Sequence, residues 1–386
     1  MANVLLGWEL GMGLWHARLL RAVGRRLQSE GHQVTYAVAN PVETWSILKN
    51  EGARLVQAPV ATPLSRSTGN EFQARAFADI LHEAGFHAPE TLGGLVGAWD
   101  GLIDAIRPDL VVCDHAPSLL VASHQRLPAV QLGLGFSQPP SDLSPWPAFG
   151  PGEGGSRFEP DVLATVNEIL RARGVKLLDT LGGLYATHAS HVTTFAEFDP
   201  YSAHRRGPFV GPLDDLPSPL NRPAHDSYFA YLSADVPESI HLLRTLASLP
   251  YAGQVFLRGA HPHLTNELRA LGLNLLDEPA DMLSVLKRHR LLIHHGGVGT
   301  SEQAAAAGRA QLVLPWHLEQ AYNAAVLEQL GLGLNVRRSE NLSEAMNSLL
   351  SSEAMEKGVR SFAELAHARR NSSASDIVME SCRIHL

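Results

Sequence analysis

The chain has 386 residues, 45% hydrophobic and 18% charged, a balance typical of a folded globular protein rather than a disordered one. Its 31 basic and 39 acidic residues give a formal net charge of −8, which argues against a broad nucleic-acid-binding face. Two cysteines, Cys113 and Cys382, are too few for a disulfide framework. The N-terminus lacks the features of a signal peptide and no apolar run reaches the roughly 18 residues that span a bilayer, so we expect a cytoplasmic protein without a transmembrane segment.

Strand and helix patterns alternate from the N-terminus. The sequence predicts a strand over residues 4–8, a helix over 14–29, a strand over 32–39, a helix from Pro41, and strands over 54–60, 109–114, 128–133 and 191–195. This alternation indicates parallel strands joined by right-handed crossovers. We therefore expect residues 1–207 to form a Rossmann-like domain. Residues 138–155 interrupt the pattern with Pro, Gly and Ser, which predicts a long exposed loop near a substrate cleft.

A proline-punctuated segment, residues 208–226, is predicted to be an interdomain linker. A second alternating series follows, with strands over 228–234, 254–259, 291–295 and 310–314. Helices are expected over 237–249, 265–271, 320–330 and 342–370. Residues 227–386 are therefore predicted to form a second Rossmann-like domain with a terminal helix. The fold class expected is α/β, with two doubly wound domains facing a central cleft.

The strongest local motif is His294-His295-Gly296-Gly297-Val298-Gly299-Thr300-Ser301-Glu302, which lies between a predicted strand and a predicted helix. Its glycines allow close approach of a ligand, and the free N–H groups and positive dipole of a helix start suit a diphosphate. A tight strand-to-helix turn without a ligand is the alternative interpretation of the motif taken alone.

The segment from Pro279 to Gly333 resembles the nucleotide-sugar signature of the family 1, UDP-glycosyltransferase-like enzymes, a group that includes bacterial enzymes modifying antibiotics and other natural products. The resemblance rests on Leu291–Ala304, on Gln311–Gln320 and on Asn323. It implies the GT-B fold, with His295 and the backbone of Gly297, Val298, Gly299 and Thr300 holding the donor diphosphate. It also implies that Glu319 and Gln320 hold sugar hydroxyls, and that Ser233 offers a hydroxyl to the phosphates. A helix N-cap before Pro237 is the alternative role for Ser233. Asp277 departs from the family pattern, which leaves the base unassigned between UDP and dTDP.

The resemblance also implies a catalytic base in the first domain. His16 lies 16 positions before His32 of the Gly31-His32 pair, the spacing that the family shows. Trp15 stands where glycine is usual, and we expect it to shape the acceptor site. Asp114 follows a predicted strand and is expected to orient His16, forming a His–Asp dyad. The neighbouring His115 is expected to point elsewhere.

These features predict an inverting, metal-independent hexosyltransferase that uses a nucleotide sugar as cosubstrate, has no other cofactor and acts on a small, aromatic or polyketide-like acceptor. The pairs His261/His263 and His294/His295 lack the acidic partners and the geometry of a metal site. A nonhydrolysing nucleotide-sugar epimerase and a nucleotide-sugar-binding protein without transferase activity remain as alternatives. A homodimer is compatible with the sequence.

Overall fold

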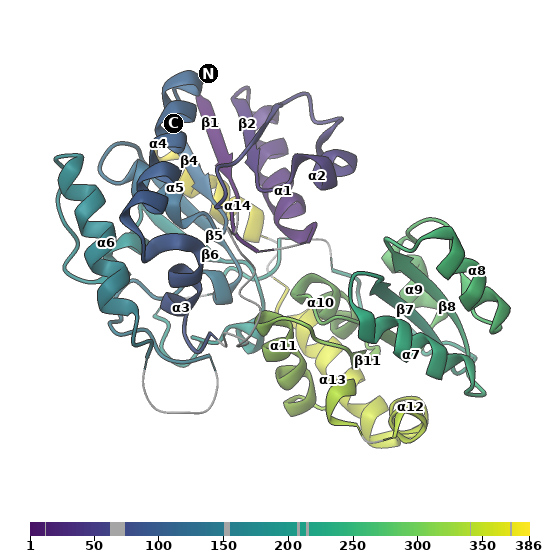
Figure 1. Ribbon diagram of the computed structural model, residues 1–386. Helices are drawn as coiled ribbons and strands as arrows, with labels where there is room; N and C mark the ends of the chain where they lie inside the picture. Colours follow the sequence, from purple (N-terminus) through teal and green to yellow (C-terminus); the bar gives the residue numbers. More distant parts are fainter. Residues whose placement is uncertain are drawn as a thin grey trace. The chain divides into compact units, whose positions relative to one another are not determined.

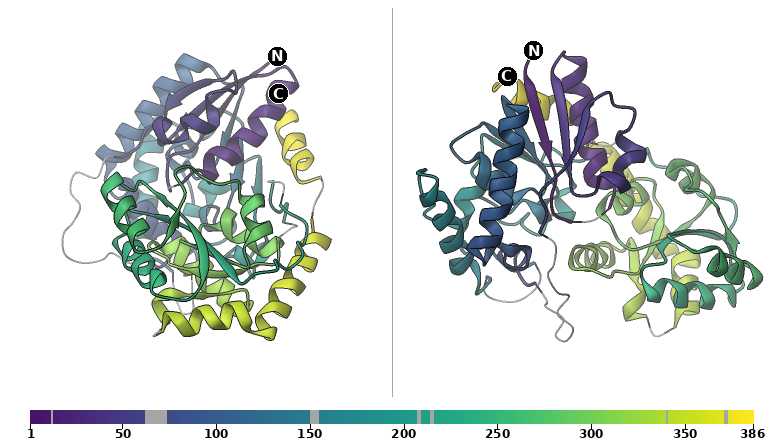
Figure 2. Two further views of the ribbon diagram at one scale, coloured as in Figure 1. Left: turned by 90° about the vertical axis from the view of Figure 1, so that its right-hand side faces the viewer. Right: turned by 45° about the horizontal axis from the view of Figure 1, so that its top comes forward.

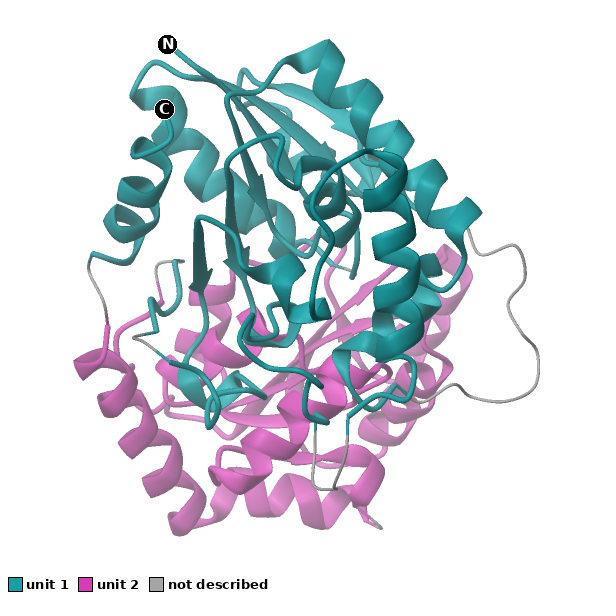
Figure 3. Cartoon of the chain, turned by 90° about the vertical axis from the view of Figure 1, so that its left-hand side faces the viewer, with its two compact units in different colours: residues 1–214, 371–386 teal, residues 215–370 magenta. Residues whose placement is uncertain are grey.

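The computed structural model describes residues 1–11, 13–61, 74–149, 155–206, 209–213, 216–339, 341–370 and 373–386. The chain divides into two compact units (Figure 3): unit 1 comprises residues 1–214 and 371–386, and unit 2 comprises residues 215–370. Each unit is built around one six-stranded parallel sheet flanked by helices (Figure 1). This architecture is the α/β class predicted from the alternating sequence patterns.

The sheet of unit 1 has the strand order β3-β2-β1-β4-β5-β6. Its strands are short and mostly buried, because apolar residues fill the runs between glycines and polar turns. The bounds are β1 Asn3–Gly7, β2 Gln33–Val38, β3 Arg54–Gln57, β4 Leu110–Cys113, β5 Ala129–Gly133 and β6 Ala189–Val192. The chain order reverses direction between β1 and β4, and such a switch point is where ligands bind in open parallel sheets.

The helices of unit 1 cover both faces of its sheet (Figure 1). They are α1 Trp15–Ser29, α2 Pro41–Leu48, α3 Phe77–Leu81, α4 Pro89–Ile106, α5 Pro117–Ser123, α6 Glu159–Ala172 and α14 Ala374–Arg383. The apolar side of α1 packs on the sheet through Leu20, Val23 and Leu27, as its periodicity predicts. Its arginines lie on the other side, where Arg21 and Arg25 both donate to the carboxylate of Glu51.

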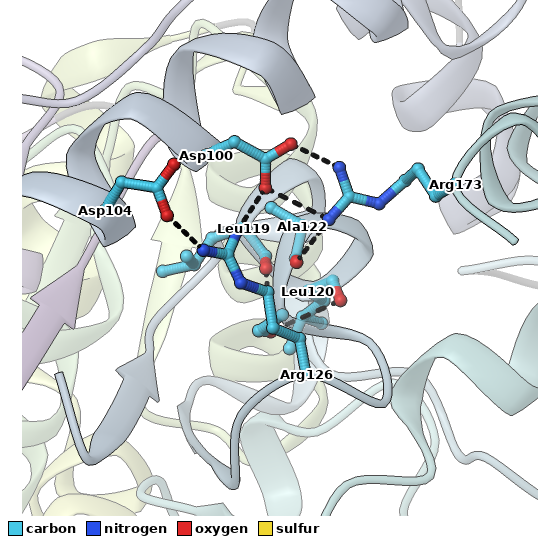
Figure 4. Close-up of polar contacts among 8 residues, drawn as sticks. Asp100, Asp104, Leu119, Leu120, Ala122, Arg126 and Arg173 are labelled. Atoms are coloured by element: carbon cyan, nitrogen blue, oxygen red, sulfur yellow. Dashed lines mark hydrogen bonds and ion pairs between the residues drawn. The ribbon is translucent and has the colours of Figure 1, made fainter. Parts of the chain in front are cut away.

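A charged network joins the helices on the opposite face of the sheet (Figure 4). Arg126, after α5, donates to Asp100 of α4 at 2.6 Å and also to Asp104. Arg173, after α6, donates to the same Asp100 at 3.0 Å and to the carbonyl of Ala122 at 3.0 Å. One carboxylate therefore links α4 to the ends of α5 and α6.

The last helix, α14, belongs to unit 1, whereas the sequence placed it in the second domain (Figure 2). Val378, Met379 and Cys382 are fully buried in the same core cluster as the strands of unit 1. On its polar side, Asp376 accepts from Arg26 at 2.6 Å. The predicted boundaries also differ at the linker, because the division between the units falls inside residues 208–226; residues 207–208 and 214–215 lie outside the described part.

Unit 2 repeats the topology of unit 1, with the order β12-β11-β10-β7-β8-β9. Its strands are β7 Ser227–Ser233, β8 Ala252–Arg258, β9 Asn274–Leu275, β10 Leu291–His294, β11 Ala310–Val313 and β12 Gly333–Asn335. Its helices are α7 Pro237–Ala247, α8 Pro262–Ala270, α9 Met282–Arg288, α10 Val298–Ala306, α11 Leu318–Gln329, α12 Leu342–Ser351 and α13 Glu353–Ala368. The single helix predicted over 342–370 is two helices, because Ser352 ends α12 and its side chain caps α13.

Residues 138–149, predicted as the first part of an exposed loop, are anchored in unit 1. Trp146 is fully buried and donates from Nε1 to the carbonyl of Pro140 at 3.0 Å, while its backbone N–H donates to Glu159 at 2.9 Å. Phe149 is also buried and stacks on Phe136 with ring centroids 4.4 Å apart. The prediction of exposure is wrong for these aromatic residues, since their burial outweighs the polar composition around them; residues 150–154 of the predicted loop lie outside the described part.

Candidate functional sites

The first candidate site lies at the switch point of unit 1. β1 and β4 run side by side in register, Gly7 opposite Cys113, and the backbone N–H of Asp114 donates to the carbonyl of Gly7 at 2.9 Å. The chain after β1 turns through glycines and enters α1, which carries His16 as its second residue. Two neighbouring strand ends therefore bring His16 and Asp114 together, although 98 positions separate them in the sequence.

His16 and Asp114 form a buried pair. Nδ1 of His16 lies 2.8 Å from Oδ2 of Asp114, and the two residues are 3% and 0% exposed. Because an ionised carboxylate only accepts hydrogen bonds, it holds the proton on Nδ1 and leaves Nε2 as the basic nitrogen. Burial raises the pKa of Asp114, and the nearby His16 opposes that rise. Trp8 stacks on the His16 ring, with centroids 4.9 Å apart, which fixes the plane of the imidazole.

Gly11 makes the approach to this pair possible. Its φ of +88° lies in the left-handed region that favours glycine, and a Cβ built at this position would lie 2.9 Å from Nε2 of His16. A side chain at residue 11 would therefore press on the basic nitrogen. Trp15 contacts the same imidazole edge-on, with ring centroids 5.5 Å apart, and is itself partly buried against the core of unit 1.

His115 lies beside the dyad, contrary to the expectation that it points elsewhere. Its ring centroid is 6.1 Å from that of His16. Burial and the neighbouring His16 lower the pKa of His115 to about 3, which makes it neutral at physiological pH. The strand rule of alternating sides fails here because β4 ends at Cys113 and the φ of His115 is +47°.

Glu9 is a buried acid just after β1 that sequence reasoning missed. Its carboxylate accepts the backbone N–H and the hydroxyl of Ser118, and the Nε1–H of Trp99 at 2.8 Å. Burial raises the pKa of Glu9 to about 7 in spite of these hydrogen bonds. Its position directly after the strand predicted over residues 4–8, at the edge where ligands bind, was the available signal.

The second candidate site lies at the corresponding switch point of unit 2, between β7 and β10. His295 follows β10; its Nδ1 lies 2.8 Å from the carbonyl of Leu314, and its Nε2 accepts the backbone N–H of Ser233 at 3.0 Å. His295 is therefore neutral in this arrangement, with its proton on Nδ1. Burial lowers the pKa of His295 in agreement with that state.

A glycine-rich turn connects His295 to α10. Gly296 has a φ of +93°, and its carbonyl accepts from Nδ2 of the buried Asn323 at 2.9 Å. Gly297 is the N-cap, so Val298, Gly299 and Thr300 form the first turn of α10. Their N–H groups have no intrahelical acceptor, and the helix dipole adds a partial positive charge at this end. The helix therefore starts directly after the glycine-rich turn, which is the position that the anion-cradle interpretation assumes.

The remaining predicted donor residues lie at the same edge of unit 2. Ser233 is 3% exposed and its hydroxyl donates to Asp235 at 3.2 Å; the N-cap of α7 is Val236, so the alternative role of Ser233 as a helix cap is wrong. Glu319 and Gln320 occupy the first turn of α11, where Oε1 of Gln320 accepts the backbone N–H of Trp316 at 3.1 Å.

The paired histidines of unit 2 make separate contacts. His294 is turned away from His295 and bonds to Gln311 at 2.9 Å, and His261 accepts the backbone N–H of His263 at the start of α8. Over the described ranges, no three His, Cys, Asp or Glu side chains are grouped as metal ligands. Asp277, which departs from the family pattern, is paired with Arg269 at 2.7 Å. Among the residues that the structure describes, no helix is long and apolar enough to cross a membrane.

Comparison with known proteins shows what the chain is similar to. Residues 276–379 match the glycosyltransferase family 28 C-terminal domain. The chain has the GT-B fold. It superposes on the kitacinnamycin glycotransferase with a TM-score of 0.69 at 17% identity, covering 98% of this chain and 99% of that one. It superposes on the calicheamicin glycosyltransferase CalG4 with a TM-score of 0.67 at 20% identity, covering 98% of both chains.

The curated relatives agree with the structural neighbours. The vancomycin aglycone glucosyltransferase of Amycolatopsis orientalis is 29% identical over 150 residues, which are 35% of this chain and 37% of that protein. The glycosyltransferase GtfC of the same organism is 34% identical over 80 residues, 19% of this chain and 20% of that protein. The chain thus aligns with 37% of the length of the first relative and 20% of the length of the second. The resemblance to GT-B glycosyltransferases of the antibiotic type is confirmed.

Proposed function

We propose that this chain is an inverting glycosyltransferase that moves a sugar from a UDP- or dTDP-linked donor to a hydroxyl of a small aromatic or polyketide-like acceptor. The observation that carries the proposal is the buried His16–Asp114 pair at the carboxyl edge of the sheet of unit 1. The donor class is supported by a structural neighbour, the glycosyltransferase VinC, solved in complex with dTDP. The acceptor class is supported by another neighbour, the spinosyn rhamnosyltransferase SpnG, solved with the spinosyn aglycone.

In the proposed reaction His16 is the general base. The proton of the acceptor hydroxyl moves to Nε2 of His16, and the imidazolium that forms is stabilised by the carboxylate of Asp114. The acceptor oxygen forms a bond to the anomeric carbon, while the bond from that carbon to the diphosphate oxygen breaks and its electron pair leaves with the diphosphate. Attack from the side opposite the leaving group inverts the anomeric configuration.

The donor site stabilises the charge that develops on the diphosphate. The first-turn N–H groups of Val298, Gly299 and Thr300 are oriented donors for phosphate oxygens. For His295 to donate as well, its Nε2 has to gain a proton and release the N–H of Ser233, which then becomes a further phosphate donor. The proposal assigns this charge stabilisation to side chains and backbone of the protein, with no metal ion and no further cofactor.

The sugar and the acceptor are assigned to neighbouring residues. Glu319 and Gln320 combine a carboxylate and an amide on the first turn of α11, and each group can pair with adjacent sugar hydroxyls. The hydrogen bond from Trp316 to Oε1 of Gln320 orients the amide so that its Nε2 is the donor. On unit 1, Trp15 is the proposed acceptor contact, because it lies edge-on to the catalytic His16.

The donor assignment is tested by thermal unfolding with UDP-glucose, dTDP-glucose, GDP-mannose and NAD. A ligand that binds only the native state at 100 times its dissociation constant adds about 2.7 kcal/mol of stability. The proposal expects a selective shift with a UDP or dTDP sugar that is lost in His295→Ala and kept in His241→Ala, an exposed histidine of α7 in the same unit. No shift with any nucleotide sugar would favour the hypothesis of a protein without donor binding and refute this one.

A further inference from the structure

Unit 2 contains a further candidate site, a cavity of about 180 Å³ at the opposite edge of its sheet from the glycine-rich turn. Arg290 comes directly before β10 and Arg309 directly before β11, so both mark the amino ends of the strands, whereas His295 follows the carboxyl end of β10. The other walls are the segment that enters unit 2 at residues 219–223 and the inner side of α13 (Figure 1). This cavity is therefore separate from the donor site.

The cavity gathers positive charge. Four arginines line it, Arg222, Arg290, Arg309 and Arg360, against two carboxylates, Glu356 and Glu364. Glu356 is shared, because it accepts from Arg222 and also lies 3.7 Å from Arg290. Glu364 pairs with Arg360 at 3.2 Å. Arg290 is also paired with Asp226, which lies just before β7. The four arginines therefore face three carboxylates, an excess of one positive charge.

Arg309 is the least compensated of these cations. It is 3% exposed, and its guanidinium donates to carbonyl oxygens alone, those of Leu286 at 2.7 Å and Asn221 at 2.7 Å among them. Within the ranges that the structure describes, no carboxylate forms an ion pair with it. Burial and the neighbouring Arg290 lower the pKa of Arg309 to about 10. Neutral carbonyl groups satisfy the hydrogen bonds of Arg309, but no carboxylate in the described part of the chain offsets the repulsion between its charge and that of Arg290.

We propose that this arginine cavity binds a phosphate group, either inorganic phosphate or the phosphate of a small phosphomonoester. An anion compensates the excess positive charge that Arg309 contributes, and guanidinium groups form charge-assisted hydrogen bonds with phosphate oxygens. A cavity of about 180 Å³ is smaller than the roughly 300–1,000 Å³ of pockets that hold drug-sized ligands, which favours phosphate or a small ester of it. Apolar side chains of Leu349, Met355 and Val359 complete the lining and favour a compact ligand over free water.

Binding of phosphate in this cavity would affect the glycine-rich turn of the donor site through α10. This helix begins at the glycine-rich turn and ends at Ala306, and the next residues, Ala307 and Gly308, line the cavity. Arg309 also fastens the chain that enters unit 2 to the sheet, through the carbonyl of Asn221. An anion that neutralises Arg309 therefore stabilises both the end of α10 and this entering segment.

The test is isothermal titration of the purified protein with inorganic phosphate and, separately, glucose 1-phosphate. We expect one site with a dissociation constant below about 10 mM in at least one titration, and a loss of affinity of about tenfold or more in Arg222→Ala, since a hydrogen bond to a charged group contributes about 1.5–3 kcal/mol. Glu356→Gln should bind more tightly than wild type, because it removes a competing carboxylate without removing a donor. Tighter binding of glucose 1-phosphate than of phosphate would assign the site to an ester.

The controls keep the result independent of the donor site and of folding. Arg244→Ala breaks a comparable exposed pair with Glu267 on another part of unit 2 and should bind as wild type does. His295→Ala should also bind phosphate normally. Absence of binding by the wild type, equal affinity in Arg222→Ala and wild type, weaker binding in Glu356→Gln, or loss of binding in His295→Ala would each overturn the proposal.

Discussion

Replacing Asp114 with asparagine changes the charge of the dyad while keeping its shape. The amide oxygen of asparagine can accept the Nδ1–H of His16 at the same 2.8 Å separation, so the imidazole keeps its place beside Trp8. The negative charge that stabilises the imidazolium is lost. The variant therefore isolates the electrostatic contribution of Asp114 to proton transfer.

The expected loss of rate follows from the proposed role. General-base catalysis by a positioned side chain contributes about 10²–10⁴-fold, and we expect Asp114→Asn to lower kcat by this factor. At about 1.4 kcal/mol per factor of ten, the loss corresponds to about 3–5 kcal/mol of transition-state stabilisation. Donor affinity should be unchanged, because the donor residues belong to unit 2 and Asp114 belongs to unit 1.

The same substitution should leave the fold as stable as before or more so. Burial raises the pKa of Asp114 above its ordinary value of 3.8. A carboxyl group with a raised pKa in the folded state stabilises the protein at a pH below its unfolded pKa, and that stability is lost as the pH rises through the folded pKa. At neutral pH the ionised Asp114 is therefore a cost, which asparagine removes.

The assay measures transfer at saturating donor and, in parallel, thermal unfolding at neutral pH. Low kcat with an unchanged or higher unfolding temperature and normal donor affinity is the predicted combination. Near wild-type kcat would refute the dyad mechanism. Low kcat together with a clearly lower unfolding temperature would show that Asp114 supports the fold rather than the reaction.

Three further predictions follow from individual contacts. Gly11→Ala should have a much lower kcat than Gly13→Ala. Both glycines have a positive φ, but a Cβ at residue 11 would press on His16, whereas a Cβ at residue 13 would meet no atom within 4 Å. Equal kcat values for the two variants would show that the contact with His16 is irrelevant. Binding of the nucleotide sugar is proposed to add a proton to His295, whose pKa is lowered in the free protein. The affinity measured by titration calorimetry should therefore be highest at acid pH and fall by up to tenfold per pH unit above that pKa. His295→Gln should abolish this slope, and an identical slope in the variant would contradict proton uptake. Burial raises the pKa of Glu9 from 4.5 to about 7, so its carboxyl group stabilises the fold below its unfolded pKa, and this stability is lost as the pH rises to 7. The size of the pKa shift limits the loss to about 3 kcal/mol. The free energy of unfolding of Glu9→Gln should lack this loss over the same pH range, and parallel pH curves for variant and wild type would refute the prediction.

Much of the fold could be predicted because its strands are short apolar runs that end at glycine or a polar turn. The run from Leu110 to Cys113 is fully buried, as expected for a parallel strand between two helical layers. The dyad was predictable for the same reason, since parallel strands place their carboxyl ends at one edge. His16 and Asp114 meet there at hydrogen-bonding distance.

The parts that could not be predicted depend on contacts distant in the sequence. The amphipathic pattern of α14 shows that it covers a core, but its burial against unit 1 is fixed by Val378 and Met379 meeting the strands there. Residues 138–149 look exposed by composition, yet Trp146 finds an acceptor at Pro140 and becomes fully buried. His115 faces the dyad because a left-handed backbone conformation breaks strand alternation, which no periodicity reveals.

The most direct test of the central claim is the turnover of His16→Ala with saturating nucleotide sugar, compared with that of His204→Ala, an exposed histidine of unit 1. Donor binding, measured by calorimetry on the same samples, serves as the check of an intact second unit. The account predicts that His16→Ala loses about 10²-fold or more of kcat while its donor affinity and the activity of His204→Ala stay at the wild-type level. Near-full transfer by His16→Ala would contradict the assignment of the general base and, with it, the proposed mechanism.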